Sequence, residues 1–264
     1  MTTTPQTSGG AAAASGLDRR IQEYIERGAD PDARGDPDAR GDRVADEAEF
    51  DALALELFAF QYEHNAAYRR FCRTRRAEPG RLTGWTQIPA VPLSAFKELT
   101  LACEPPGQAA AVFMTSGSTD PSRRGRNHHP HLRLYDASMR AAFAQHFMPD
   151  RDRMRLLVLN PRIDEERHSS IAYFCTRLVD FFGAPGSNFF VGPEGLQTQR
   201  LAAALRDAEA TGEPVALVGT SFAYVHLLDE LAEHGFSCSL PDGSRLLDTG
   251  GFKGRSREVS AADL

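Results

Sequence analysis

The sequence predicts an α/β protein with a largely parallel sheet flanked by helices. From residue 111 onward, apolar runs of strand length alternate with segments whose apolar residues recur every three or four positions. Because a helix between two strands usually carries the chain to a parallel neighbour, this alternation favours a parallel sheet. The expected strands are 111–114, 155–159, 188–191, 215–218 and 245–248. The expected helices between them are roughly 130–147, 169–182, 194–211 and 221–234.

An extension of 45 residues precedes the folded part, which is expected to span 46–264. Residues 1–16 are mostly Thr, Gly, Ala and Ser, a composition that predicts disorder. The six residues PDARGD occur twice in tandem over 31–42 and have no apolar face, so we interpret them as a linker. Between these stretches, apolar residues at helical spacing predict one short amphipathic helix that starts near Leu17 and stops at Gly28.

The folded part is expected to begin with helices. Apolar residues three and four apart predict one long helix over 46–72. The segment Ile88–Pro92 holds two prolines and predicts a rigid extended passage. Ser94 then stands where it can cap a short helix that runs through Glu98.

Composition and charge exclude several classes of protein. The 264 residues are 41% hydrophobic and 25% charged, which is ordinary for one large globular domain or two small ones. A net charge of -6 argues against a general nucleic-acid binder, which usually carries a basic excess. No run of about 18 apolar residues occurs, so no membrane-spanning helix is expected. The four cysteines form no CxxC pair, which argues against a zinc knuckle or a disulfide framework and predicts a cytoplasmic protein.

A loop rich in hydroxyl groups follows the expected strand 111–114. Glycine lets a ligand approach the backbone, and the hydroxyl and N–H groups are donors that suit phosphate. Arg124, with Arg123 and Arg126 beside it, could neutralise phosphate oxygens. A plain polar loop is the alternative, and the spacing is not that of a Walker A loop. The loop residues are Thr115, Ser116, Gly117, Ser118 and Thr119.

Three histidines follow at His128, His129 and His131. Such a cluster suggests a metal ion, but adjacent residues cannot all face one ion and no cysteine or carboxylate nearby completes a site. We therefore expect a polar loop edge here and no metal site.

A second candidate segment follows the expected strand 215–218 and opens a helix. It approaches the GxSxG nucleophile elbow of serine hydrolases, with alanine in the last position. His226 and Asp229 lie on the same downstream helix, whereas a hydrolase takes its histidine and acid from later strands. Helix capping by Thr220 or Ser221 is the simpler interpretation. The segment consists of Gly219, Thr220, Ser221 and Phe222.

A third candidate segment follows the expected strand 245–248. Gly250 and Gly251 stand at its carboxyl end, where paired glycines would let a flat ligand lie against bare backbone. Phe252 and a basic turn come next. A glycine-rich turn without a ligand is the alternative.

Several of these segments together resemble the acyl-protein synthetase (LuxE-like) family, whose type members are the long-chain-fatty-acid luciferin-component ligases of bacterial luminescence. The resemblance covers roughly residues 55–264, and its specificity comes from the combination and order of the motifs. The motifs are Tyr62-Glu63-His64-Asn65 with Tyr68-Arg69, Ile88–Pro92 with Ala95-Phe96-Lys97, Thr115–Thr119, Gly219–Phe222 and Leu247–Arg255.

The resemblance implies the N-terminal part of the adenylate-forming (ANL) fold and its chemistry. A carboxylic acid, expected to be a long-chain fatty acid, would react with ATP in the presence of Mg²⁺ to give an acyl-adenylate. The acyl group would pass to a protein thiol and on to an acyl reductase or another acyl-acceptor protein. The resemblance assigns Thr115–Thr119 and Arg124 to the phosphates, Gly250–Phe252 to the adenine pocket and Gly219–Phe222 to the acid.

The sequence also departs from the family pattern. Asp120 and Pro121 stand where the family continues with glycine, and the segments that carry the acyl-accepting cysteine and the catalytic lysine have no counterpart here. Residues 260–263 have the pattern of a capping box, which predicts the start of a new helix, and the sequence stops one residue later at Leu264. We therefore expect an incomplete fragment with no acid-dependent ATP–pyrophosphate exchange. A serine hydrolase using Ser221 and a non-catalytic nucleotide-binding remnant remain the alternatives.

Overall fold

The computed structural model describes residues 8–28, 47–115, 123–251 and 259. These residues form two compact units. Unit 1 comprises the described residues up to Phe113 together with Gly125–Asp150, and unit 2 comprises the remainder. The tandem repeat over 31–42 and the capping box over 260–263 lie outside the described residues.

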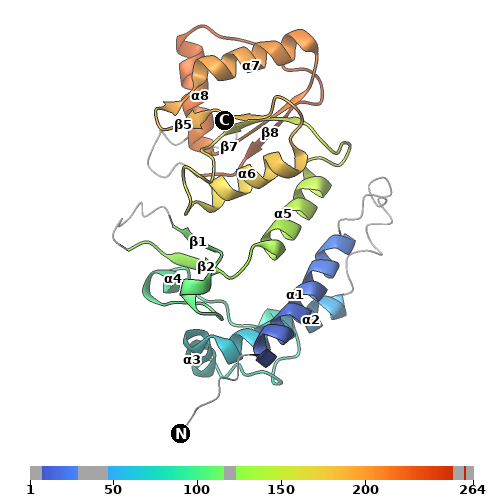
Figure 1. Cartoon of the computed structure of the whole chain (residues 1–264), viewed down its shortest axis with the longest axis vertical. Coiled ribbons are helices and arrows are strands. Elements are labelled where there is room, and N and C mark those ends of the chain that lie inside the picture. The colour runs from blue at the N-terminus through green and yellow to red at the C-terminus, as the bar shows by residue number, and fades with distance from the viewer. Residues whose placement is uncertain (1–7, 29–46, 116–122, 252–258, 260–264) are drawn as a thin grey trace. The chain divides into compact units, whose positions relative to one another are not determined.

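Helices dominate unit 1 (Figure 1). The helix α1 (Ser8–Gly28) contacts α2 (Glu47–His64) and α5 (Arg133–His146). Ion pairs join α1 to α2 at Arg20–Glu56 (2.6 Å) and Arg27–Glu49 (2.5 Å). Since exposed ion pairs contribute little, the burial of Leu17 carries more of the docking energy.

Helix α1 begins earlier than the predicted start near Leu17. It replaces the disorder predicted for the residues from Ser8 to Gly16. Four consecutive alanines, Ala11–Ala14, lie in this first part of α1, and alanine has the highest helix propensity of any residue. The prediction of disorder relied on the low apolar content of residues 1–16 and did not take the helix propensity of alanine into account.

The single long helix predicted over 46–72 is wrong. The structure ends α2 at His64 and starts α3 (Ala66–Thr74) after a break at Asn65. Asn65 has an extended backbone, and its side-chain oxygen accepts a hydrogen bond from the N–H of Tyr68 at 3.0 Å. An asparagine in this position caps a new helix, so the apolar spacing continues while the helix axis does not.

The predicted cap at Ser94 is also wrong. Helix α4 (Ala95–Glu98) begins at the expected place, but the Ser94 side chain makes no capping bond. Its backbone has φ -60° and ψ -26°, which is helical, whereas a capping serine is normally extended. Two short 3₁₀ helices, Trp85–Gln87 and Pro106–Gln108, complete this part of unit 1.

The strand predicted over 111–114 is present as β1 (Ala111–Met114), but it does not join the parallel sheet. It pairs with β2 (Arg126–His129) in a separate two-stranded sheet. Its length and apolar character are local properties of the sequence, whereas the choice of partner depends on the tertiary fold.

Unit 2 confirms the predicted fold class. Its four-stranded sheet has the order β4-β3-β7-β8, and every neighbouring pair is parallel. The strands β3 and β7 are central, and β7 is buried along its whole length. This burial on both faces explains the continuous apolar runs that predicted the strands. The strands are β3 (Arg155–Leu159), β4 (Asn188–Phe189), β7 (Val215–Gly219) and β8 (Arg245–Asp248).

Helices cover both faces of this sheet (Figure 1). One face packs against α7 (Thr198–Thr211) and α8 (Ser221–Glu233) through a single apolar cluster. Helix α6 (Ser170–Phe182) lies against the other face and contacts β3. The predicted helices 169–182, 194–211 and 221–234 correspond to these three helices.

The strand predicted over 188–191 is shorter than expected. It leaves the parallel sheet after Phe189, and Val191 belongs to a small antiparallel pair formed by β5 (Val191–Gly192) and β6 (Gly195–Leu196). Gly195 has φ 99°, a conformation that only glycine adopts without strain, and it provides the tight reversal.

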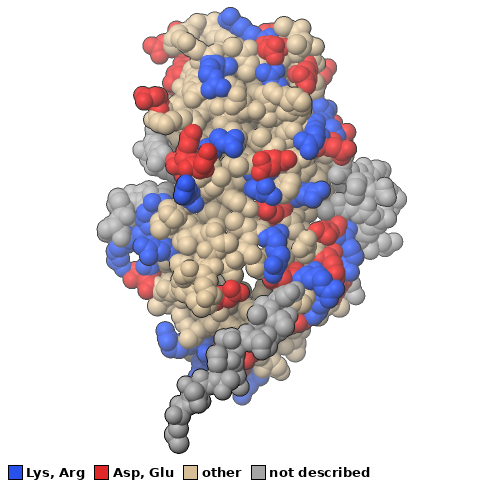
Figure 2. All heavy atoms as spheres, viewed as in Figure 1, with Lys and Arg blue, Asp and Glu red and all other residues tan. Residues whose placement is uncertain are grey.

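Charged side chains of both signs are interspersed over the face shown in Figure 2. Among the described residues, no helix is long and apolar enough to cross a membrane.

Candidate functional site

Two of the predicted site segments meet at the carboxyl edge of the parallel sheet. Gly219 ends β7 and pairs with Asp248, which ends β8. Because β3 has β4 on one side and β7 on the other, the order of the strands reverses beside β7. Ligands of open α/β sheets bind at the carboxyl ends of strands near such a reversal.

Hydrogen bonds join the two segments directly. The N–H of Thr249 donates to the carbonyl of Gly219 at 2.9 Å, and the N–H of Phe222 donates to the carbonyl of Gly251 at 3.4 Å. The Asp248 carboxylate accepts from the Ser221 hydroxyl at 2.7 Å and from the N–H of Gly250 at 2.8 Å. The predicted acid-binding segment and the predicted adenine-binding segment therefore form one structure.

The glycines of this structure are required for two different reasons. A Cβ on Gly219 would lie 3.0 Å from the Cβ of Leu159 and 3.4 Å from the ring of Tyr224, so the strand end has no room for a side chain. Gly250 and Gly251 have φ 77° and 93°, and they leave the backbone bare on an exposed turn.

Thr220 is the one buried polar side chain at this edge whose hydroxyl has no partner among the described residues. The residue is 3% exposed, and its Oγ1 is fully shielded. Thr220 occupies the N-cap position of α8, yet its side chain makes no capping bond, so the expected capping by this hydroxyl is wrong. Ser221 does not cap either, because its hydroxyl binds Asp248. Thr220 therefore carries a buried hydroxyl at the start of α8 without a partner among the described residues, which lowers the stability of the fold.

The Tyr224 hydroxyl connects the two strands that end at this edge of the sheet. It donates to the carbonyl of Leu217 at 2.8 Å and lies 3.1 Å from the carbonyl of Leu247, which joins β7 to β8. Burial, and after it the charge of Asp248, raises the pKa of Tyr224 above its ordinary value of 10.0. The phenol therefore stays protonated at neutral pH and holds the two strand ends in place.

The predicted phosphate loop is described only at its base. The N–H of Met114 donates to the carbonyl of His168 at 2.9 Å, and the Arg124 guanidinium donates through Nε to the carbonyl of Thr115 at 2.6 Å. Ser116, Gly117, Ser118 and Thr119 lie outside the described residues, as does Phe252. Arg124 therefore closes the loop at Thr115, and the meeting of this loop with Gly250 stays a prediction.

The comparison with protein families decides the identity. A family model described as "Acyl-protein synthetase, LuxE" matches residues 43–263. The chain belongs to the acyl-protein synthetase family. The resemblance read from the motifs is thereby confirmed, and the matched region excludes α1. A search of curated proteins returns no match.

The surroundings of Ser221 do not support the alternative that this chain is a serine hydrolase. Ser221 donates its hydroxyl to a carboxylate, whereas a serine nucleophile must give its proton to an imidazole. The His226 ring lies edge-on to Phe222, with 5.9 Å between the ring centroids.

The four cysteines are poorly suited to nucleophilic attack at neutral pH. Burial raises the pKa of Cys103 to about 11, with Glu104 adding to the shift, and burial raises that of Cys175 to about 12. Burial also raises the pKa values of Cys72 and Cys238. Since the thiolate is the reactive form, these groups are unreactive thiols. In the part of the chain that the structure describes, no three metal-ligating side chains come together.

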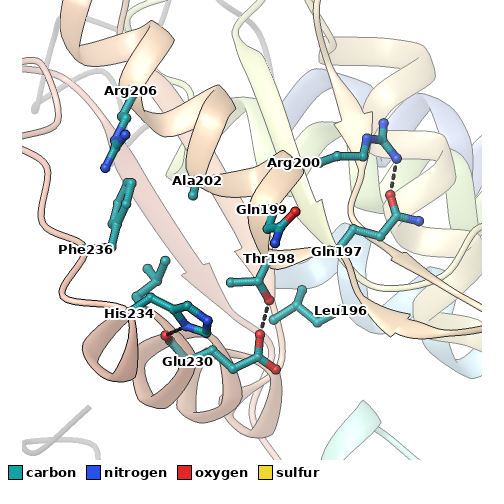
Figure 3. A pocket seen from close by; sticks show the side chains of 11 residues that line it. Leu196, Gln197, Thr198, Gln199, Arg200, Ala202, Arg206, Glu230, His234 and Phe236 are labelled. Atoms are coloured by element: carbon teal, nitrogen blue, oxygen red, sulfur yellow. Dashed lines mark hydrogen bonds between the residues drawn. The ribbon is translucent and has the colours of Figure 1, made fainter.

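Sequence reasoning missed a hollow of about 530 Å³ between α7 and α8 (Figure 3). Two hydrogen bonds join side chains that line the hollow: Thr198 donates to Glu230, and Arg200 donates to Gln197. The Arg206 guanidinium lies 4.9 Å from the centroid of the Phe236 ring. These contacts pair several of the polar groups that line the hollow, and no motif in the sequence marks it.

Proposed function

We propose that this acyl-protein synthetase activates a carboxylic acid, most simply a long-chain fatty acid, with ATP for transfer to a protein thiol. The observation that carries the proposal is the joined edge structure, where hydrogen bonds link the start of α8 and the end of β7 to the exposed glycine turn at Gly250 and Gly251. Family membership supports the same chemistry.

In the proposed reaction, a carboxylate oxygen of the acid attacks the α-phosphorus of ATP. The new bond joins that oxygen to phosphorus, and the bond from phosphorus to the bridging oxygen breaks, so that pyrophosphate leaves with the electron pair. Mg²⁺ would neutralise triphosphate charge and is commonly held largely by phosphate oxygens and water. A site of this kind accelerates the step by positioning the reactants and stabilising charge.

Each segment has a role in this proposal. The loop Thr115–Thr119 with Arg124 would hold the β- and γ-phosphates, and Gly250–Phe252 would line the adenine. The segment Gly219–Phe222 would lie along the acid. The acyl group would pass to a protein thiol and on to an acyl-acceptor protein such as an acyl reductase.

Calorimetric titration of the full chain with a non-hydrolysable acyl-sulfamoyl adenosine tests the proposal. We expect binding and a raised melting temperature, since a ligand at a hundred times its Kd stabilises the fold by about 2.7 kcal/mol. No heat and no thermal shift would refute it. Binding without acid-dependent ATP–pyrophosphate exchange would favour the non-catalytic alternative.

A matched pair of variants locates the binding. Gly250→Ala and Gly80→Ala place the same methyl group at similar positive φ angles, 77° and 80°, with open space around both. Their strain should be alike, but only Gly250→Ala should weaken the adenylate mimic. Equal binding by the two variants would place the mimic away from Gly250.

A further inference from the structure

Asp248 is the last residue of β8, and both oxygens of its carboxylate accept hydrogen bonds. One oxygen accepts from the Ser221 hydroxyl at 2.7 Å, and the other accepts from the N–H of Gly250 at 2.8 Å. Ser221 opens α8, whereas Gly250 belongs to the glycine turn that follows β8. A single side chain therefore connects the start of a helix to a turn that lies 29 residues further along the chain.

The glycine turn has few other contacts that hold it in place. A Cβ on Gly250 or Gly251 would meet no described atom within 4 Å, so no side chain packs against that side of the backbone. The N–H of Phe222 donates to the carbonyl of Gly251 at 3.4 Å, which is longer than the usual range of about 2.7–3.2 Å. The bond from Gly250 to Asp248 is therefore the shorter of the two that hold the turn among the described residues.

Ser221 provides a fixed anchor for the Asp248 carboxylate. The residue is 5% exposed, and the following turn of α8 packs into the apolar cluster of the sheet through Ala223 and Tyr224. The Ser221 hydroxyl consequently has a defined position relative to the sheet. Because Asp248 binds both this hydroxyl and Gly250, it transfers that position to the glycine turn.

We propose that Asp248 is a positioning residue of the adenylation site, where it holds the glycine turn at a fixed separation from the start of α8. The inference rests on the proposed function, in which the turn lines the adenine and Gly219–Phe222 lies along the acid. An acyl-adenylate spans both segments, so their separation must match the length of the ligand. Segments that are held in place before binding reduce the ordering cost that binding must overcome.

A direct contact between Asp248 and the ligand is the alternative role. A carboxylate has lone pairs for about four hydrogen bonds, so the two bonds to the protein do not use all of them. Ser221→Ala distinguishes the two roles, because it removes the anchor and leaves the carboxylate. It should weaken the ligand if Asp248 acts through position, and it should have no effect if Asp248 only contacts the ligand.

Calorimetric titration of the full chain with the acyl-sulfamoyl adenosine mimic measures these effects. Asp248→Ala should weaken binding about tenfold, and Ser221→Ala should weaken it about three- to tenfold. Asp248→Asn should bind within about threefold of the wild type, because its amide oxygen accepts from Gly250 and its amide nitrogen donates to the Ser221 hydroxyl. The matched control Asp242→Ala removes an exposed carboxylate in the turn before β8 and should leave binding unchanged.

The double variant tests whether the two side chains act as a unit. Both single substitutions break the same hydrogen bond, so Ser221→Ala should add little to the effect of Asp248→Ala. Full additivity of the two effects, or an unchanged affinity in Ser221→Ala, would overturn the proposal. An affinity of Asp248→Asn as low as that of Asp248→Ala would overturn it too, because the charge and not the position would then matter.

The amide signal of Gly250 reports on the turn in the absence of ligand. In protein labelled with nitrogen-15 glycine, Gly250→Ala identifies this signal by its loss. Asp248→Ala should move the proton resonance upfield, because the bond to a charged acceptor is lost, whereas Asp242→Ala should leave it in place. Unchanged signals from the other glycines show that the fold is intact, and a Gly250 signal that does not move in Asp248→Ala contradicts the positioning role.

The outcomes separate this proposal from the proposed function. If the mimic does not bind the wild type, the proposed function fails and the positioning role fails with it. If the mimic binds the wild type and Asp248→Ala equally well, the proposed function stands and the positioning role alone fails. If Asp248→Ala does not fold, Ser221→Ala and Asp248→Asn give the same decision.

Discussion

Replacing Thr220 by valine should stabilise the fold. The valine side chain keeps the shape of threonine and removes only the hydroxyl. That hydroxyl is buried without a partner and makes no capping bond to α8. The folded protein therefore loses a desolvated polar group and no interaction.

The size of the gain follows from the surroundings of the hydroxyl. A buried polar group without a partner costs about 1–3 kcal/mol, so Thr220→Val should raise the free energy of unfolding by about that amount. Thr176→Val is the matched control in the same unit. The Thr176 hydroxyl donates to the carbonyl of Ala172 at 2.8 Å and accepts from the N–H of Ile163 at 3.1 Å. Its removal should lower the free energy of unfolding by about 1–3 kcal/mol.

Urea unfolding at pH 7, followed by far-UV circular dichroism, measures both changes. The two variants should shift the midpoint in opposite directions. A loss of 1 kcal/mol or more in Thr220→Val would show that the hydroxyl is engaged in the protein, and the reasoning would fail.

Three other substitutions test the local structure. Gly219→Ala should lower the free energy of unfolding, measured with urea, by about 1–3 kcal/mol, because its Cβ would crowd Leu159. Gly107→Ala is the control, because its Cβ would meet open space and should change the free energy of unfolding little. Equal losses in the two variants would contradict the close packing at Gly219. Tyr224→Phe should cost about 1–2 kcal/mol at pH 7. It should also flatten the alkaline loss of stability, because a raised pKa contributes stability that is complete below pH 10.0 and is lost as the pH rises; an unchanged profile from pH 9 to 11 would count against this role. Asn65→Ala should cost about 1 kcal/mol by uncapping α3, and unchanged thermal unfolding would exclude a capping role.

The parallel sheet could be predicted because its strands carry a strong local signal. The expected bounds of β3 and β8 match the structure. For β3, which is central, the reason is that strands buried on both faces read as continuous apolar runs. The sequence also marks the break at Asn65, because asparagine is a common N-cap residue. The helical spacing of apolar residues continues across Asn65, however, and this spacing led to the prediction of one long helix.

The pairing of residues at the site could not be predicted in the same way. Ser221 and Asp248 meet only because β7 and β8 are neighbours in a particular register, and no local pattern specifies a register between distant strands. The burial of the histidine nitrogens was missed for a related reason. His129 and its neighbours were interpreted as a polar loop edge, because the sequence does not show that their nitrogens are shielded.

The order of the strands affects how this protein is made. Leu157 of β3 pairs with Leu217 of β7, so β3 must wait for its central partner while about 60 further residues are synthesised. At about 5–20 residues per second, the wait on the ribosome is roughly 3–12 s. During that time the edge of β3 that later pairs with β7 has no partner strand. A supply of chaperones should therefore improve the yield of folded chain, because chaperones protect this exposed strand edge until its neighbour arrives.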